Sequence, residues 1–364
     1  MNLLFSRIRR PVERDHAAFY VLLTLLSFAF SVVGTRLFLQ LTGYPQLGGK
    51  TLHIAHLLWG GLLLFIGALG MLVFANRWVY RAGAILSGVG VGLFIDEVGK
   101  FITRSNDYFY PPAAPIIYAF FLMVVLVYLR LRRNVRRSPR AELYRALDSM
   151  EEVLEHDLDA VEQAQLESRL QYVIENAEER AHVQLARELL RFIYSEHVAL
   201  VTRETGWGER ILLRLKGWDE RWVTRKRLKA VLVGGMGTLG LWAIQDLGRS
   251  VLAFFSPNQL ERVLLSMVSA GRLGGGTSLG WLQTNFSLQA ACGLVLLAAT
   301  VLLVRNYEVR GVSVGFVGLL LLLTIANLLE FYFDQFSAIM PALTELGLLL
   351  ALIHYRQKFI RAAI

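Results

Sequence analysis

The sequence has a single cysteine, Cys292, among its 364 residues. One thiol can form neither a disulfide framework nor a cysteine metal site within the chain, so both are excluded, as is redox chemistry through paired thiols. Charged residues are also scarce, because Asp, Glu, Lys and Arg make up 18% of the chain while 55% of it is hydrophobic. A soluble protein needs more polar side chains to cover its surface. The composition therefore predicts an integral membrane protein.

The chain also lacks the patterns of a nucleic-acid or nucleotide binder. Its net charge is +9, but no basic stripe interleaved with aromatic residues follows a path that a phosphate backbone could use. The glycine-rich segment 271–278 has no P-loop lysine. We therefore expect no nucleic acid partner. The positive charge is better explained by orientation in a lipid bilayer and by attraction to the anionic lipids of its inner leaflet.

Long apolar runs recur along the chain. About twenty apolar residues in a helix cross a hydrocarbon core of about 30 Å, at about 1.5 Å per residue. These runs are continuous, without the alternation of barrel strands, so they predict helices. Eight are present, at 18–41, 52–75, 83–103, 113–130, 229–255, 284–304, 312–334 and 338–355. The predicted fold class is all-α, a polytopic membrane protein with about eight transmembrane helices.

The basic residues predict the orientation of these spans. Of the 38 Lys and Arg residues, 31 fall in the segments on one side of the predicted membrane and four in those on the other. Because basic loops stay inside, both termini are predicted to be cytoplasmic, in a plasma (inner) membrane. The first apolar run is expected to be a retained span, since it is too long for a signal peptide and no cleavage pattern follows it.

A charged insert divides the predicted spans into two groups of four. Residues 1–130 form a first transmembrane half, 131–227 a cytoplasmic helical insert, and 228–364 a second transmembrane half. Arg36 and Arg249 occupy matching positions in the two halves, which leaves open a parallel duplication.

The insert is predicted to contain two or three amphipathic helices, followed by an interfacial one. Leu, Val and Ile recur at helical spacing among charged residues. Ser138 followed by Pro139 indicates a helix start, and Asp159 with Glu162 indicates a capping box. The insert is interpreted as a structural linker, or as a sensor that docks a cytoplasmic protein partner or a second copy of the chain.

Ionisable residues inside a membrane are costly, so they indicate function or internal pairing. Those predicted here gather near the outer ends of the spans: His53, His56, Asp96, Glu97, Lys100, Asp246, Arg249, Glu330, Asp334 and Glu345. The inner halves of the spans have almost none. A proton-coupled transporter or ion pump would need such groups through the midplane, so the distribution favours an outward-facing polar site.

The sharpest pattern joins H-I-A-H at 53–56 with G-V-G-V-G-L-F-I-D-E-V-G-K at 88–100. Histidines three residues apart project from one helical face. The glycines Gly88, Gly90 and Gly92 could let the third span pack tightly against the second, which would bring the carboxylates to the imidazoles.

Two imidazoles and a carboxylate are ligands of catalytic zinc and of several other divalent metals. His53, His56 and Asp96 are therefore predicted to hold a divalent metal, and Glu97 to act as general base, with Asp96 in either role. These are the parts of a metal-dependent hydrolase acting on a lipid-borne or extracytoplasmic substrate.

Two alternatives stay open. The same residues could form a polar binding or transport site without metal. They could also be a structural network, in which Asp96 pairs with Lys100 four residues later and Asp246, Arg249, Glu330 and Asp334 pair across helix ends. The chain would then be a structural or signalling protein that works through its cytoplasmic helices.

The segment that contains H-I-A-H-L-L-W-G and G-V-G-V-G-L-F-I-D-E-V-G-K resembles a group of uncharacterised multi-spanning prokaryotic membrane proteins with an H-x-x-H-x-x-x-G motif and a D-E pair. The resemblance covers the second and third predicted spans and implies no established activity. Ala55 stands where such proteins carry an adjacent histidine, which weakens a ligand set of several histidines.

Overall fold

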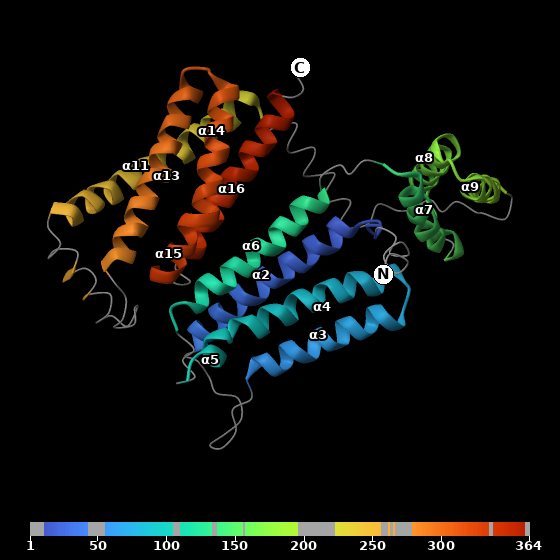
Figure 1. Cartoon of the computed structure of the whole chain (residues 1–364), viewed down its shortest axis with the longest axis horizontal. Helices are drawn as coiled ribbons and strands as arrows, with labels where there is room; N and C mark the ends of the chain where they lie inside the picture. Colours follow the sequence, from blue (N-terminus) through green and yellow to red (C-terminus); the bar gives the residue numbers. More distant parts are fainter. Residues whose placement is uncertain are drawn as a thin grey trace, which may run out of the picture. The chain divides into compact units, whose positions relative to one another are not determined.

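In the part of the chain that it describes, the computed structural model consists of helices joined by turns and irregular segments (Figure 1). The described residues are 11–42, 55–104, 110–132, 137–155, 157–195, 223–255, 261–262, 265, 279–334 and 338–360. No strand occurs in these ranges, so the predicted all-α class is confirmed for them.

Seven described helices are long and apolar enough to cross a membrane. They are α2 (Ala17–Thr42), α3 (His56–Val73), α4 (Arg77–Asp96), α6 (Ala113–Arg132), α13 (Leu279–Val304), the helix that begins with α14 (Glu308–Leu321), and α16 (Ile339–Tyr355). The remaining predicted span lies within α11 (Arg225–Phe255). Some side chains of this helix are outside the part of the chain that the structure describes. The count of eight therefore stays a prediction.

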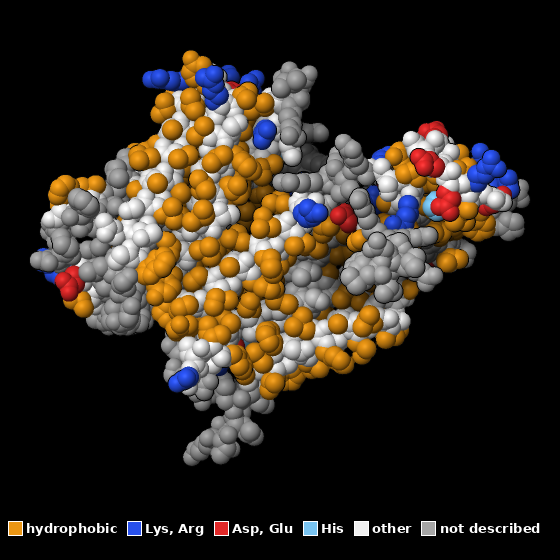
Figure 2. Space-filling model, in the orientation of Figure 1, with side chains coloured by type: hydrophobic (Ala, Val, Ile, Leu, Met, Phe, Trp, Pro, Cys, Tyr) orange, Lys and Arg blue, Asp and Glu red, His pale blue; other side chains and the backbone are white. Residues whose placement is uncertain are grey.

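The flanks of these helices expose large apolar side chains. Phe30 is 78% exposed, Leu72 84% and Met340 71%. On the face shown in Figure 2, hydrophobic side chains cover the long helices, whereas charged side chains gather at helix ends and over the short helices. Apolar surface on this scale is unfavourable in water and favourable against lipid tails, which fits a multi-pass membrane protein.

The chain forms two compact units. The first contains residues 1–54, 58–92 and 124–212, and the second contains 55–57, 93–123 and 213–364. Three helices, α3, α4 and α6, contribute residues to both. The division into two four-helix halves stays a prediction.

In the first unit, α4 packs against α2 through glycines. A Cβ atom added to Gly88 would clash with the backbone carbonyl oxygen of Thr24, and one added to Gly92 would lie 2.7 Å from Cβ of Ser31. The close approach lets the Thr24 and Ser31 hydroxyls donate hydrogen bonds of 3.1 Å to backbone carbonyls of α4. Small residues thus provide van der Waals contact and interhelical hydrogen bonds together.

Gly90 lies on the opposite side of α4 and contacts α3. A Cβ atom there would lie 2.7 Å from the carbonyl oxygen of Gly60. The prediction that the glycines bring the third span against the second is confirmed for Gly90 but wrong for Gly88 and Gly92. Gly88 and Gly92 are four residues apart and share one face of the helix, whereas Gly90, between them, lies on another. The three glycines therefore contact two neighbouring helices, α2 and α3.

The predicted insert forms three helices, α7 (Pro139–Leu154), α8 (Ala160–Asn176) and α9 (Arg180–Ile193). They share a core of Leu143, Ala146, Leu166, Leu170, Val173, Ala186 and Ile193. Both predicted caps are confirmed. The Ser138 hydroxyl accepts a hydrogen bond from the Ala141 amide, and Asp159 forms a capping box with Glu162.

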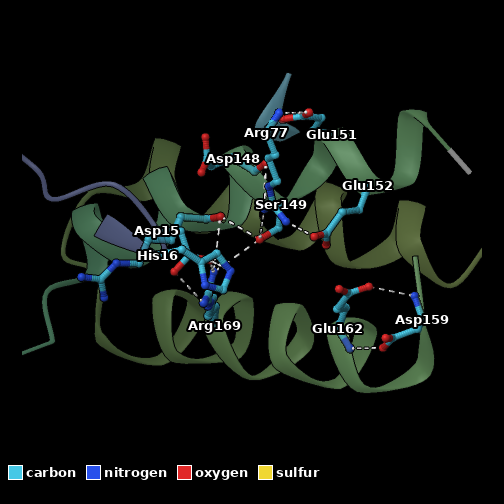
Figure 3. A network of polar contacts seen from close by, with 11 residues as sticks. Asp15, His16, Arg77, Asp148, Ser149, Glu151, Glu152, Asp159, Glu162 and Arg169 are labelled. Carbon is cyan, nitrogen blue, oxygen red and sulfur yellow. Dashed lines mark hydrogen bonds and ion pairs between the residues drawn. The ribbon is translucent and has the colours of Figure 1, made fainter. Parts of the chain in front are cut away.

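Polar contacts join these helices to the start of α4 and to the segment before α2 (Figure 3). The Arg77 amide donates to the Glu151 carboxylate at 2.7 Å, and the Arg77 guanidinium pairs with Glu152. The third span was expected to begin at residue 83, but α4 begins at Arg77. Glu151 satisfies an amide that the first helical turn leaves without a partner, so the helix can start earlier.

Arg169 holds the other contact, with nitrogen atoms 2.8 and 3.1 Å from the two Asp15 oxygens. Burial alone would raise the pKa of the Asp15 carboxyl, but the hydrogen bonds and charge of Arg169 hold that pKa below its ordinary value of 3.8. A carboxyl with a lowered folded-state pKa stabilises the fold fully above its unfolded value, and the contribution is lost as pH falls through the folded value.

We therefore expect the protection factors of the Ala17 and Phe19 amides, which donate to the Arg14 and His16 carbonyls, to fall as pH drops below about 3.8. In an Asp15→Asn variant these protection factors should already be lowered at neutral pH. Equal protection factors in wild type and variant at neutral pH would contradict a role for the Asp15 charge.

The second unit has its own apolar core, between α11, α13, α14 and α16. Its buried side chains include Leu232, Met236, Leu296, Leu352 and Tyr355. After α14 the helix passes through a π-helical segment, Leu322–Ala326, into α15 (Asn327–Asp334). A π-helical turn holds an extra residue, and such turns occur often at functional sites.

Candidate functional site

A break between two helices places adjacent carboxylates in the interior of the second unit. Helix α4 ends at Asp96 and α5 (Val98–Ile102) begins at Val98, with Glu97 in the turn between them. Both acidic residues are fully buried, at 0% exposure. Burying charges without partners would cost several kcal/mol each, so their surroundings must supply compensation.

His56, the first residue of α3, supplies part of it. Its Nε2 atom lies 3.1 Å from an Asp96 carboxylate oxygen, within hydrogen-bond distance. Its Nδ1 atom lies 3.4 Å from a Glu97 oxygen. The imidazole is partly accessible, with 22% of its side chain exposed. One face of the site is therefore an imidazole held between two buried carboxylates.

Glu97 accepts hydrogen bonds from two further groups. The Lys100 ammonium donates a hydrogen bond of 2.6 Å to one of its oxygens, and the Leu57 amide donates one of 3.3 Å to the other. The second bond caps the exposed amino end of α3, where the helix dipole favours negative charge. Lys100 was predicted to pair with Asp96 at helical spacing, but the ion pair shown is with Glu97, because the helix does not continue through the turn.

The structure describes only part of the predicted metal site. Within the described ranges, no group of three or more His, Cys, Asp or Glu side chains is arranged to hold a metal ion. His53 lies outside those ranges. The second span was expected to begin at residue 52, but Ala55 is not helical and α3 begins at His56. His53 as a ligand stays a prediction.

A second set of polar contacts lies among the helices of the same unit. The Asn327 side-chain amide donates a hydrogen bond of 2.6 Å to the Glu345 carboxylate, and both residues are buried. Gln289 on α13 donates to the Glu330 carboxylate on α15. The sequence prediction named both glutamates but not Gln289. A polar residue inside the apolar run 284–304 was the available signal.

The π-helical segment Leu322–Ala326 also accepts a polar contact, from α6. The Tyr118 hydroxyl on α6 donates a hydrogen bond of 2.6 Å to the Leu323 carbonyl, and its ring stacks on Phe331 with centroids 4.4 Å apart. The side chains of Asp246, Arg249 and Asp334, which were also predicted, lie outside the described part.

No protein-family model, curated protein or solved structure matches the chain. The fold and the site therefore carry the functional argument alone. The resemblance noted for the second and third spans stays a prediction.

The geometry of the cluster of His56, Asp96 and Glu97 limits the chemistry that this cluster can carry out. A buried carboxylate that hydrogen-bonds one imidazole nitrogen fixes the ring's tautomer and orientation. The partly exposed imidazole can then exchange a proton with a bound molecule through Nδ1, once its longer contact of 3.4 Å with Glu97 opens. Glu97, which already holds Lys100 and the start of α3, is better suited to positioning than to proton transfer.

Proposed function

We propose that the chain is an eight-span membrane protein whose outward-facing site at His56 and Asp96 carries out acid–base chemistry on a lipid-borne or extracytoplasmic substrate. The observation that carries the proposal is the hydrogen bond between the fully buried Asp96 and the partly exposed His56. Hydrolysis is the reaction class that we favour, with His56 as general base and Asp96 as its orienting partner.

The site would also suit a divalent metal if His53 joined it. Ligands with bonds of about 2 Å in a tetrahedral zinc site lie about 3.3 Å from one another, close to the 3.1 Å between His56 Nε2 and the Asp96 oxygen. His53, His56 and Asp96 would then hold the ion, which would lower the pKa of a bound water.

Metal analysis separates the two forms of the proposal. Full-length protein purified without chelator or His-tag should contain about one divalent metal per chain if the site is a metal centre. His53→Ala and His56→Ala should each remove it. Wild-type protein without stoichiometric metal would exclude the metal-dependent form and leave the metal-free acid–base pair.

Activity is tested by comparing cells that produce wild type or the Asp96→Asn variant, with lipids and extracytoplasmic extracts analysed by mass spectrometry. We expect one compound class to be depleted by the wild type alone, because the amide cannot stabilise the charged imidazole; the rate should fall at least about 100-fold. Glu188→Gln, an exposed change on α9, should behave as wild type. Identical extracts from wild-type and variant cells would remove the hydrolase proposal.

The outward orientation needs its own test. In a Cys292→Ser background, a membrane-impermeant thiol reagent should label Ser105→Cys and Gly275→Cys in intact cells. It should not label Met150→Cys, since α7 is predicted to be cytoplasmic. A labelled position 150 would overturn the orientation and, with it, the outward-facing site.

A binding or transport role is the second candidate. The Asn327–Glu345 and Gln289–Glu330 pairs favour it, because they place amides and carboxylates among otherwise apolar helices. Asn327→Leu should then abolish ligand uptake or binding while leaving the compounds depleted through His56 unaltered. If Asn327→Leu abolished both the ligand binding and the depletion of compounds through His56, the two groups of polar residues would serve a single function.

A further inference from the structure

A cavity of about 630 Å³ lies in the first unit, where the end of α6 meets α7 and α8. Charged residues dominate its walls: Arg132, Arg137, Arg145, Arg169, Glu13 and Glu142. Ser168 and Gln165 add neutral hydrogen-bonding groups. The volume falls in the range of small-molecule sites, but these walls suit a charged ligand rather than an apolar one.

Two of the four arginines are held by carboxylates. Arg145 pairs with Glu142 at 2.9 Å, and Arg169 pairs with Asp15 at 2.8 Å. These ion pairs fix the α7 and α8 sides of the cavity and the segment before α2.

The other two arginines bring positive charge that the described carboxylates do not pair with. Arg132 belongs to the last turn of α6, and Arg137 follows shortly after it. Among the described residues neither forms an ion pair, and the Arg137 guanidinium lies over the Tyr172 ring at 5.9 Å. Two guanidinium groups at one cavity can hold a phosphate group through paired hydrogen bonds.

The position along α6 also favours a phosphate. Helix α6 is one of those long and apolar enough to cross a membrane, and Arg132 is its last residue. The end of a spanning helix lies near the depth of lipid headgroups, where basic pockets recognise anionic lipids.

We propose that this cavity binds a phosphate-bearing anion through Arg132 and Arg137. The group would come from the headgroup of an anionic phospholipid or from free phosphate in solution. A bound phosphate would join the end of α6 to α7 and α8. The proposal concerns the first unit and does not depend on the chemistry at His56.

The test uses the purified full chain in neutral detergent, with two probes. Phosphatidylglycerol and phosphatidylcholine are supplied in equal amounts, and retained lipid is measured by native mass spectrometry. Inorganic phosphate is supplied separately, against chloride at equal ionic strength, and the thermal unfolding midpoint is measured. The variant is Arg132→Gln with Arg137→Gln. The control, Arg180→Gln with Arg187→Gln, removes the same charge from exposed positions on α9.

If the source is lipid, phosphatidylglycerol should be retained over phosphatidylcholine, and affinity should fall about 30-fold in the Arg132/Arg137 variant but not in the control. If the source is free phosphate, phosphate should raise the midpoint of wild type and control but not of the variant. If the glutamine variant fails to fold, Arg132→Lys with Arg137→Lys keeps the charge and should show reduced retention or protection. No preference in either arm, or equal loss in control and variant, would overturn the proposal.

Discussion

Replacing Glu97 with alanine is expected to lower the free energy of unfolding by about 3 kcal/mol, the largest effect of any single change at the site. The carboxylate is fully buried and holds both the Lys100 ammonium and the Leu57 amide. Its removal takes away the hydrogen bonds that these two groups donate to it. Unfolding of the purified protein in mixed micelles with increasing denaturing detergent measures the difference.

The matched control is Glu188→Ala. Glu188 also forms an ion pair three residues apart along one helix, with Arg191 at 2.7 Å, but 55% of its side chain is exposed. An exposed pair of this kind contributes about 0.5 kcal/mol or less. Similar losses in the two variants would show that the Glu97 contacts are no stronger than surface contacts.

The second large effect is expected for Gly88→Ala. A methyl group there would meet the backbone carbonyl of Thr24 and the side chain of Ser27, 2.7 Å away. A backbone atom cannot turn aside as a side chain can, so α2 and α4 must separate, at a cost of about 2 kcal/mol. The hydroxyl bond from Thr24 to α4 should weaken as well. The same unfolding titration measures the loss.

Gly61→Ala on α3 provides the comparison, because an added Cβ meets nothing within 4 Å. Its stability should equal or slightly exceed that of wild type, since alanine favours a helix over glycine. Equal behaviour of the two variants would mean that Gly88 has no role in close packing.

The helices were predictable because a membrane selects for them through length and apolar composition alone. The residues at which the helices begin and end were harder to predict. Helix α4 begins at Arg77 because Glu151, distant in sequence, accepts its amide hydrogen bond. The residues around 77 do not reveal that contact, although Asn76, a residue type favoured at helix N-caps, is a local signal for a helix start there. The caps at Ser138 and Asp159 were predictable because the contacts that make them lie within a few residues.

The contacts of the candidate site were likewise predictable only in part. The approach of His56 to Asp96 followed from matching depth on consecutive antiparallel spans. The ion pair of Lys100 with Glu97 was not predicted, because the regular helical spacing of Asp96 and Lys100 no longer applies once the chain turns at Glu97. Gln289 was not predicted, because an uncharged amide inside an apolar run leaves little trace in composition.

The π-helical segment Leu322–Ala326 can be viewed as an α-helix into which one residue has been inserted. Deleting one residue there would restore a continuous α-helix and remove the wide turn whose Leu323 carbonyl accepts the Tyr118 hydroxyl bond. Asn327 and Glu330 would keep their bonds to Glu345 and Gln289, and the bond from α6 would be the one lost. Among related chains, the length of this segment and a tyrosine at this place on α6 should therefore be inherited together, as one character that a single codon deletion removes.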